Sequence, residues 1–390
     1  MSKKYARFLT CFFCGFLAVI FTASALTPDK AFSEVENRTL AQKPTLSLAD
    51  LSPAQLIGDK GDFYTGAYMA DYETYVTDQF PARDVWVAAK AWTERLVGKQ
   101  ENNGGYFCDD GALITRFEEP DWTRVDNNIG YVNKFAEKAG VPVTFGLIPT
   151  QATVWANKLP AGAPNYDQKD ILDRAEAASA APMADLYTAL MAHKDEAIFY
   201  RTDHHWTSLG AYYGYAALGE ALGYEPLPLE TYTKTTVSDQ FYGTVFSSSG
   251  VRWVEPDEMD VYVPETDRIT VESHTYDTKG NPVVEPRQLY DESYLDKKDK
   301  YAMFLGGQQA LGVVKTGNTD KPKLLLVRDS YSDSLVPFLT PHFSEIHLID
   351  LRYYKLSASQ YIADNGIDQA LVLYSVPNFV SDANLVWLGR

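Results

Sequence analysis

Runs of consecutive apolar residues alternate along the chain with stretches in which apolar residues recur every three or four positions. Apolar runs of strand length predict buried strands, and the helical spacing predicts amphipathic helices. The predicted strands span residues 141–149, 197–200, 323–327, 344–351 and 369–376. The predicted helices span residues 121–139, 171–193 and 209–222, and one more lies between the last two strands. This alternation is typical of a parallel α/β sheet covered by helices on both faces.

Three segments depart from the alternation. Residues 59–97 carry aromatic residues at helical spacing, and Pro81 in the sequence DQFPARD divides them into two predicted helices. Residues 102–114, NNGGYFCDDGALI, have the alternation and glycine turn of a hairpin. Residues 232–316 are rich in Val, Tyr and Thr with scattered Gly and Pro, which predicts an inserted region of antiparallel strands.

The N-terminus predicts export. Residues 8–26 form an apolar run of about the length that spans a bilayer, and Lys3, Lys4 and Arg7 precede it. Because positive flanks stay in the cytoplasm, the chain beyond the run is expected outside it. The length of the run favours a transmembrane signal anchor. Small residues around Ala25 leave open a cleaved signal peptide, which would make the protein secreted.

The pattern divides the chain into three parts. Residues 1–26 are the signal anchor or signal peptide. Residues 27–58 are polar with prolines and no helical period, which predicts an extended linker or arm lying on the domain. Residues 59–390 form one α/β catalytic domain, with the β-rich insertion at about 232–316.

Charge and cysteine content narrow the function classes. Removing the cations of Lys3, Lys4 and Arg7 from the formal net charge of −17 leaves −20 for the exported part, which argues against nucleic acid and anionic membrane surfaces as partners. Two of the three cysteines lie in the apolar run, so Cys108 has no disulfide partner in the exported part. We therefore expect neither a thiolate metal cluster nor a redox pair, and no cofactor.

The sequence TDHHWT carries the first candidate for catalysis. Asp203 and His205 are two residues apart, so at a strand end they point to the same side, and the carboxylate can orient the imidazole as a general base. His204 is expected to face the other way. An isolated Asp-x-His before a helix is about as often structural, capping the helix near Thr207, as it is catalytic. Zinc is the third alternative, but no ligand spacing links the pair to other histidines.

Ser330 is the candidate nucleophile. It lies in RDSYSDS, where an apolar strand runs into a turn and a helix, the position at which parallel sheets present ligand-binding groups. Backbone amides of this turn favour developing negative charge. Asp329, Ser330 and Ser332 would also serve as ordinary helix caps. The weaker candidates for an oxyanion or substrate contact are Tyr331, Gly243, Asn378, Arg328 and Trp206.

The chain resembles the DHHW family of exported bacterial proteins, which is similar to the SGNH-like alginate O-acetyltransferases of the cell envelope. The resemblance rests on SEVENRTLAQKP, DQFPARD, NNGGYFCDDGALI, LIPTQATVW, TDHHWTSLGAYYGY, FYGTVFSSSG and RDSYSDS, which together cover nearly all of the exported chain. It implies an SGNH-hydrolase-like three-layer sheet. It also implies that Asp203, His205 and Ser330 are the catalytic residues, the same three that position along the chain favours.

Two departures from the family pattern matter. Arg328 stands where many SGNH serine motifs have glycine, which puts the oxyanion geometry in doubt. No carbohydrate-binding module is expected after Arg390, so polymer binding is expected to use the catalytic cleft or the β-rich insertion.

The resemblance implies transfer of acetyl groups to the hydroxyls of an extracellular polysaccharide through an acyl-serine. The alternatives are a carbohydrate esterase with the same triad and a catalytically idle scaffold or glycan-binding protein. A polysaccharide acceptor and a membrane-bound multi-pass acyltransferase that supplies acetyl groups are the implied partners.

Overall fold

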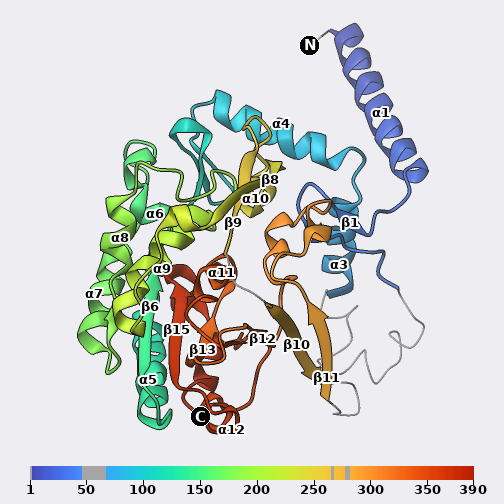
Figure 1. Ribbon diagram of the computed structural model, residues 1–390. Helices are drawn as coiled ribbons and strands as arrows, with labels where there is room; N and C mark the ends of the chain where they lie inside the picture. The colour runs from blue at the N-terminus through green and yellow to red at the C-terminus, as the bar shows by residue number, and fades with distance from the viewer. Residues whose placement is uncertain (1, 46–66, 265–267, 277–281) are drawn as a thin grey trace. The chain divides into compact units, whose positions relative to one another are not determined.

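The computed structural model describes residues 2–45, 67–264, 268–276 and 282–390 (Figure 1). The chain forms two compact units. The smaller comprises Met1–Lys99 with Gly250–Arg252, and the larger comprises Gln100–Ser249 with Trp253–Arg390. The family motifs TDHHWT and RDSYSDS both belong to the larger unit.

The larger unit is built on a mixed sheet whose strand order, among the described residues, is β11-β10-β12-β14-β13-β15-β6-β7. The strands are β6 (Val143–Ile148), β7 (Met183–Ala184), β10 (Thr270–Tyr276), β11 (Pro282–Arg287), β12 (Leu311–Lys315), β13 (Lys323–Arg328), β14 (Glu345–Ile349) and β15 (Gln369–Ser375). Strands β14, β13, β15, β6 and β7 are parallel, and β12, β10 and β11 extend the sheet with antiparallel pairing. In Figure 1, β6, β15 and β13 run side by side. The predicted α/β class with a largely parallel sheet is confirmed.

The helices of the larger unit form two groups by their contacts with one another. The helices of the larger unit are α5 (Trp122–Lys138), α6 (Gln151–Val154), α7 (Lys169–Ala178), α8 (Leu186–Ala192), α9 (Ser208–Leu222), α10 (Thr244–Ser249), α11 (Val336–Leu339), α12 (Ala358–Asn365) and α13 (Val376–Ser381). Helix α5 contacts α7, α12 and α13, whereas α9 contacts α8 and α11. The parallel strands between them are almost entirely buried; every residue of β6 is. The apolar runs are continuous because both faces of these strands are covered.

Two sequence predictions need correction here. Residues 197–200 do not form a strand of the sheet; they make only an isolated antiparallel bridge between Phe199 and Trp206. The single helix predicted over residues 171–193 is instead α7, the short strand β7 and α8. Pro182 lies at the break, and it cannot donate the backbone hydrogen bond that a continuing helix requires.

The β-rich insertion also differs from the prediction. Its strands are antiparallel, but β10, β11 and β12 join the main sheet instead of forming a separate region. Strands β8 (Thr233–Phe241) and β9 (Asp257–Val263) pair only with each other. The predicted hairpin at residues 102–114 is present as β3 (Glu101–Asn102), β4 (Gly105–Phe107) and β5 (Leu113–Thr115), with Gly104 at a φ of 79° in the turn.

The smaller unit contains the apolar helix α1 (Lys3–Leu26), whose mean hydropathy of 2.2 and length suit a membrane span or a signal sequence. It also contains the predicted helix pair, α3 (Ala67–Asp78) and α4 (Arg83–Leu96), separated at Pro81. The expected arm folds as the short pair β1 (Phe32–Ser33) and β2 (Arg38–Thr39). The remainder of the arm at residues 46–58, and the start of the first helix at 59–66, lie outside the described residues.

Ion pairs fix the arm to the helix pair within the smaller unit. Both carboxylate oxygens of Asp78 accept from the guanidinium of Arg38, at 2.9 and 2.5 Å. Arg83 pairs with Glu36. The motifs SEVENRTLAQKP and DQFPARD therefore meet in one charged cluster.

Candidate active site

The turn after β13 is held by the carboxylate of Asp329. This carboxylate accepts hydrogen bonds from the Tyr331 N–H at 3.0 Å, from the Ser375 N–H and hydroxyl at 2.8 and 2.7 Å, and from the Asn378 amide at 2.8 Å. Ser375 ends β15, the parallel neighbour of β13. Asp329 therefore connects the carboxyl ends of two adjacent strands and fixes the backbone on either side of Ser330.

Ser330, His205 and Asp203 form a continuous chain of hydrogen bonds. His205 Nε2 lies 2.8 Å from Ser330 Oγ, and His205 Nδ1 lies 2.6 Å from Asp203 Oδ1. With the carboxylate ionised, the imidazole proton sits on Nδ1, so Nε2 accepts from the serine hydroxyl. His205 is 5% exposed and Asp203 is 1% exposed. This arrangement can draw a proton from Ser330 and stabilise the resulting imidazolium.

Asp203 is held in the ionised form although it is buried. Burial alone would raise its pKa, but the pKa is well below the usual range because His204 and His205 lie beside it and because His205 and the Thr244 N–H donate to it. The Thr244 N–H donates to Asp203 Oδ2 at 2.7 Å and the Thr244 hydroxyl at 3.0 Å. The carboxylate is therefore a fixed negative charge behind the histidine.

Aromatic rings fix the plane of the imidazole. The ring of Tyr301 stacks on His205 with centroids 3.8 Å apart and an interplanar angle of 8°. The Tyr301 hydroxyl donates to the Ser330 carbonyl at 3.1 Å. Tyr331 packs on the same imidazole, with centroids 5.0 Å apart. Tyr301 thus contacts both the imidazole of His205 and the backbone of Ser330.

The sequence predicted that His204 faces away from His205, but the structure places the two rings together. The two rings are 3.9 Å apart, and His204 Nδ1 lies 2.5 Å from the Thr244 hydroxyl. The segment is an irregular loop, so the alternation of a strand does not apply to it. Desolvation, with the nearby His205, lowers the pKa of His204 to about 4. His204 is therefore neutral at physiological pH.

This pKa predicts acid sensitivity. Between pH 6.5 and 4 the unfolded chain binds a proton at residue 204 that the folded chain does not, so the free energy of unfolding falls as pH falls through this window. Because 38% of the His204 side chain is exposed, we expect a contribution of only about 1–2 kcal/mol. In urea unfolding at a series of pH values, His204→Gln should reduce the fall by this amount. An unchanged slope in the variant would contradict the assignment. Asp203 loses its contribution only at lower pH and does not interfere.

A cavity of about 330 Å³ in the larger unit is lined by residues that adjoin His205 and Ser330 in the chain. None of the three hydrogen-bonded residues is itself among the described residues that line it. Its lining includes His204, Thr244, Tyr331 and Asn378. The cavity brings together side chains from the loop before α9, the start of α10, the turn after β13 and the start of α13. A volume of this size accommodates a small acyl group together with part of its donor or acceptor.

Three of the weaker candidates are engaged elsewhere in the structure. Arg328 is fully buried and pairs with Asp333 at 3.0 Å, so it does not reach the cavity. The Gly243 N–H donates to the Thr202 hydroxyl at 3.0 Å and is not directed at a substrate. Trp206 is fully buried, and its indole N–H donates to the Tyr331 carbonyl at 2.8 Å, so it supports the turn instead of contacting substrate.

Two of the weaker candidates do line the cavity. The Tyr331 side chain reaches it, but the Tyr331 N–H is bound by Asp329 and its hydroxyl donates to the His204 carbonyl. The Asn378 amide donates one hydrogen to Asp329, which leaves its second N–H for another acceptor.

Three supporting residues were missed by the sequence reasoning. Thr244 binds Asp203, Tyr301 stacks on His205, and Asp329 organises the turn, although the sequence singled out Asp329 only as a helix cap. The cap of α9 is Thr207, whose hydroxyl accepts from the Gly210 N–H at 3.2 Å, so Asp203 is not needed for capping. The motif FYGTV was the signal available for Thr244; nothing local marks Tyr301.

Metal binding has to be weighed at the same residues. Ligand atoms of Asp203, His204 and His205 lie within 4.8 Å of one another. Both ring nitrogens of His205 already have partners, Asp203 and Ser330. A metal ion bound there would have to displace at least one of these hydrogen bonds.

Comparison with known proteins bears on this geometry. The family model described as DHHW protein matches residues 171–349, which include both TDHHWT and RDSYSDS. Two structures of Bacillus cereus PatB1, one with a sulfonyl adduct, are 21% identical. Their TM-scores are 0.59 and 0.58, covering 71% and 72% of this chain and 96% and 97% of theirs. At this identity the likeness shows a shared fold. No protein with a curated description matches significantly.

A crystal structure of a DHHW family protein from Eubacterium siraeum is 30% identical, with a TM-score of 0.63. The match covers 74% of this chain and 95% of that one. Sequence and structure thus agree over almost the whole length of that protein, and this chain belongs to the DHHW family.

Proposed function

We propose that this protein is an SGNH-like O-acetyltransferase that works outside the cytoplasm on a polysaccharide through an acyl-serine intermediate. The observation that carries the proposal is the hydrogen-bonded chain from Ser330 through His205 to Asp203 beside a cavity of about 330 Å³. The predicted three-layer arrangement belongs to the same proposal, supported by the two groups of helices on the parallel strands.

The reaction follows from the three side chains. Ser330 Oγ attacks the carbonyl carbon of an acetyl ester while His205 Nε2 takes its proton. The tetrahedral intermediate collapses, His205 returns the proton to the departing alkoxide of the donor, and acetyl-Ser330 remains. A sugar hydroxyl then attacks the acetyl carbon as His205 removes its proton. When the intermediate collapses, Ser330 leaves and regains the proton from His205.

Negative charge develops on the acetyl oxygen in both steps. Ser330 is the first residue of a 3₁₀ turn, and the first backbone N–H groups of such a turn have no partner within it. Together with the second N–H of Asn378, it is our proposed oxyanion donor. Arg328 lies buried beneath the turn, so its presence in place of glycine does not obstruct this donor pair.

The molecule that accepts the acetyl group from Ser330 determines which of two activities the same residues carry out. If water replaces the sugar hydroxyl, the protein is a carbohydrate esterase. The acidic exported part and helix α1 support a membrane-anchored or secreted protein that acts on uncharged sugar hydroxyls. A multi-pass acyltransferase in the membrane remains our proposed source of acetyl groups.

The test is covalent labelling with a fluorophosphonate probe. We expect the purified full chain in detergent to be labelled on the peptide that carries Ser330, and Ser330→Ala to be unlabelled. Ser332→Ala is the matched control, because Ser332 is two residues away and fully buried. Absence of labelling in the wild type, where a known SGNH esterase is labelled, would favour the idle scaffold.

Exhaustive chelation should leave labelling and turnover intact; loss of both would favour a metal at Asp203, His204 and His205.

A further inference from the structure

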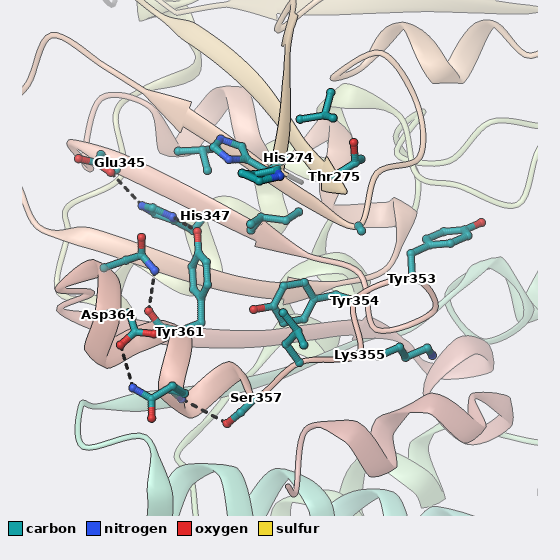
Figure 2. A pocket seen from close by; sticks show the side chains of 18 of the residues that line it. His274, Thr275, Glu345, His347, Tyr353, Tyr354, Lys355, Ser357, Tyr361 and Asp364 are labelled. Carbon is teal, nitrogen blue, oxygen red and sulfur yellow. Dashed lines mark hydrogen bonds and ion pairs between the residues drawn. The ribbon is translucent and has the colours of Figure 1, made fainter. Parts of the chain in front are cut away.

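A second and larger hollow lies on the antiparallel half of the main sheet, in the larger unit. This groove has a volume of about 980 Å³ and runs over β10, β12 and β14 (Figure 2). His274 and Thr275 of β10 lie on one side of it, and the segment from Tyr353 to Asp364, which includes α12, forms the other side. It shares no lining residue with the cavity beside Ser330.

The groove has an apolar floor and aromatic walls. Leu311 and Val313 of β12 form part of the floor. Tyr353 is 49% exposed, and Tyr361 is held in place by a 2.7 Å hydrogen bond between its hydroxyl and His347 Nδ1. His347 Nε2 in turn lies 2.9 Å from Glu345. The Tyr353 hydroxyl donates to the Gln308 side chain, so both tyrosine rings are held as amphipathic surfaces, which bind at a low cost in conformational entropy.

The rim of the groove is polar and electrically balanced. Gln360 and Asp364 are exposed on α12, and the Gln360 amide donates to the Asp364 carboxylate at 2.8 Å. Lys315 pairs with Glu272 at 2.9 Å, and Glu345 pairs with Lys323 at 2.9 Å. The groove is lined by two lysines, Lys315 and Lys355, and two carboxylates, Glu345 and Asp364. Because these charges balance, the groove presents no strong field for a polyanion.

We infer that this groove binds an uncharged stretch of a glycan chain. Fixed aromatic rings suit the apolar faces of sugar rings, and the amide and carboxylate of Gln360 and Asp364 suit paired hydroxyl groups. Along the strand direction the lining extends from Leu311 to Lys315 of β12, which is four intervals or about 14 Å at about 3.4 Å per residue. This length fits several sugar units and exceeds a single small ligand.

The groove also has a defined relation to the catalytic edge. Strands β13 and β14 are parallel neighbours, so they end at the same edge of the sheet. Ser330 follows β13 and Tyr353 follows β14, which places one end of the groove at the edge where acyl transfer is proposed. This role rests on the proposed function: the groove would hold the polymer whose hydroxyls are acetylated.

The experiment is affinity electrophoresis of the full chain in native detergent gels that contain galactomannan, xylan, mixed-linkage β-glucan or glycol chitin. At least one polymer should retard the wild type, and Tyr353→Ala and Gln360→Ala should each weaken the retardation at least tenfold. Tyr187→Ala is the matched control, because Tyr187 is half-buried on α8 and does not line the groove.

Turnover of p-nitrophenyl acetate, measured on the same samples, separates the two proposals. Tyr353→Ala should leave this turnover unchanged, and Ser330→Ala should abolish it while keeping wild-type retardation. Retardation by none of the four polymers would overturn the glycan assignment, whatever the turnover. A dimer of the wild type that Tyr353→Ala dissociates in sedimentation velocity would assign the groove to a second copy instead. Retardation of a wild-type protein that shows no turnover would support glycan binding by the groove and contradict the proposed acetyltransferase activity.

Discussion

His205→Ala is expected to lower the turnover of p-nitrophenyl acetate by about 10³-fold or more, and Ser330→Ala by a similar factor. Each variant breaks the 2.8 Å hydrogen bond between imidazole and hydroxyl, so neither leaves an activated nucleophile. Because the two residues act as a unit, the double variant should be no slower than either single variant. Initial rates and intact mass, which detects acetyl-Ser330, provide the measurement.

His193→Ala is the matched control for the loss of a histidine. His193 lies at the end of α8, away from the triad residues, with its ring stacked on Tyr213. It should retain wild-type turnover. If His205→Ala is well folded and as active as the wild type, or if the double variant is slower by the product of the single effects, the triad reading fails.

Gly243→Ala is expected to have the largest effect of any substitution that leaves the triad side chains intact. A methyl group at residue 243 would clash with Asp203 Cβ and Oδ2 and would lie 2.6 Å from Cγ, so the carboxylate must move. If Asp203 moves away from His205, the imidazole of His205 loses the carboxylate that orients it. A displacement of this kind lowers turnover by about 10²-fold or more. We expect kcat to fall while KM for p-nitrophenyl acetate changes little, because Gly243 contacts Asp203 and not the cavity.

Gly130→Ala is the matched control. Gly130 lies inside α5 with open space where a Cβ would be, so alanine there should preserve activity and favour the helix. Wild-type kcat in a folded Gly243→Ala protein would mean that Asp203 need not occupy its observed position. A loss of folding without a change in kcat per folded molecule would assign Gly243 a purely structural role.

Local sequence patterns predicted the parts of the site that depend on one segment. Asp203 and His205 are two residues apart, and Ser330 follows a continuous apolar strand, so each could be placed from its own neighbours. The structure brings these three side chains together, and their catalytic roles remain a proposal. Gly243 was a candidate for a backbone N–H near the site, whereas the structure shows the close approach of Asp203, from 40 residues earlier in the chain. No local periodicity reports such an approach.

In the fold, too, features that depend on one segment could be predicted from the sequence, and features that depend on contacts between distant segments could not. Apolar runs predicted β13, β14 and β15 because burial on both faces leaves a local signature. The Val, Tyr and Thr content of residues 232–316 indicated antiparallel strands but not their partners, since such a strand can pair at any open sheet edge. Strand β12 pairs with the edge of β14, and β10 pairs with β12, which together form the floor of the groove. Tyr301 could not be predicted for a similar reason: it lies 96 residues beyond His205 in the chain, and only the fold brings the two rings together.

The four hydrogen bonds accepted by Asp329 have a consequence for how new specificities could arise in this protein. They tie the backbone around Ser330, the proposed nucleophile, to β15 in the folded protein, so binding a different substrate would require no rearrangement of the proposed triad. Substitutions around the rim can therefore accumulate without disturbing the reactive atoms. Selection is free to exchange one acceptor for another while the chemical step stays as it is.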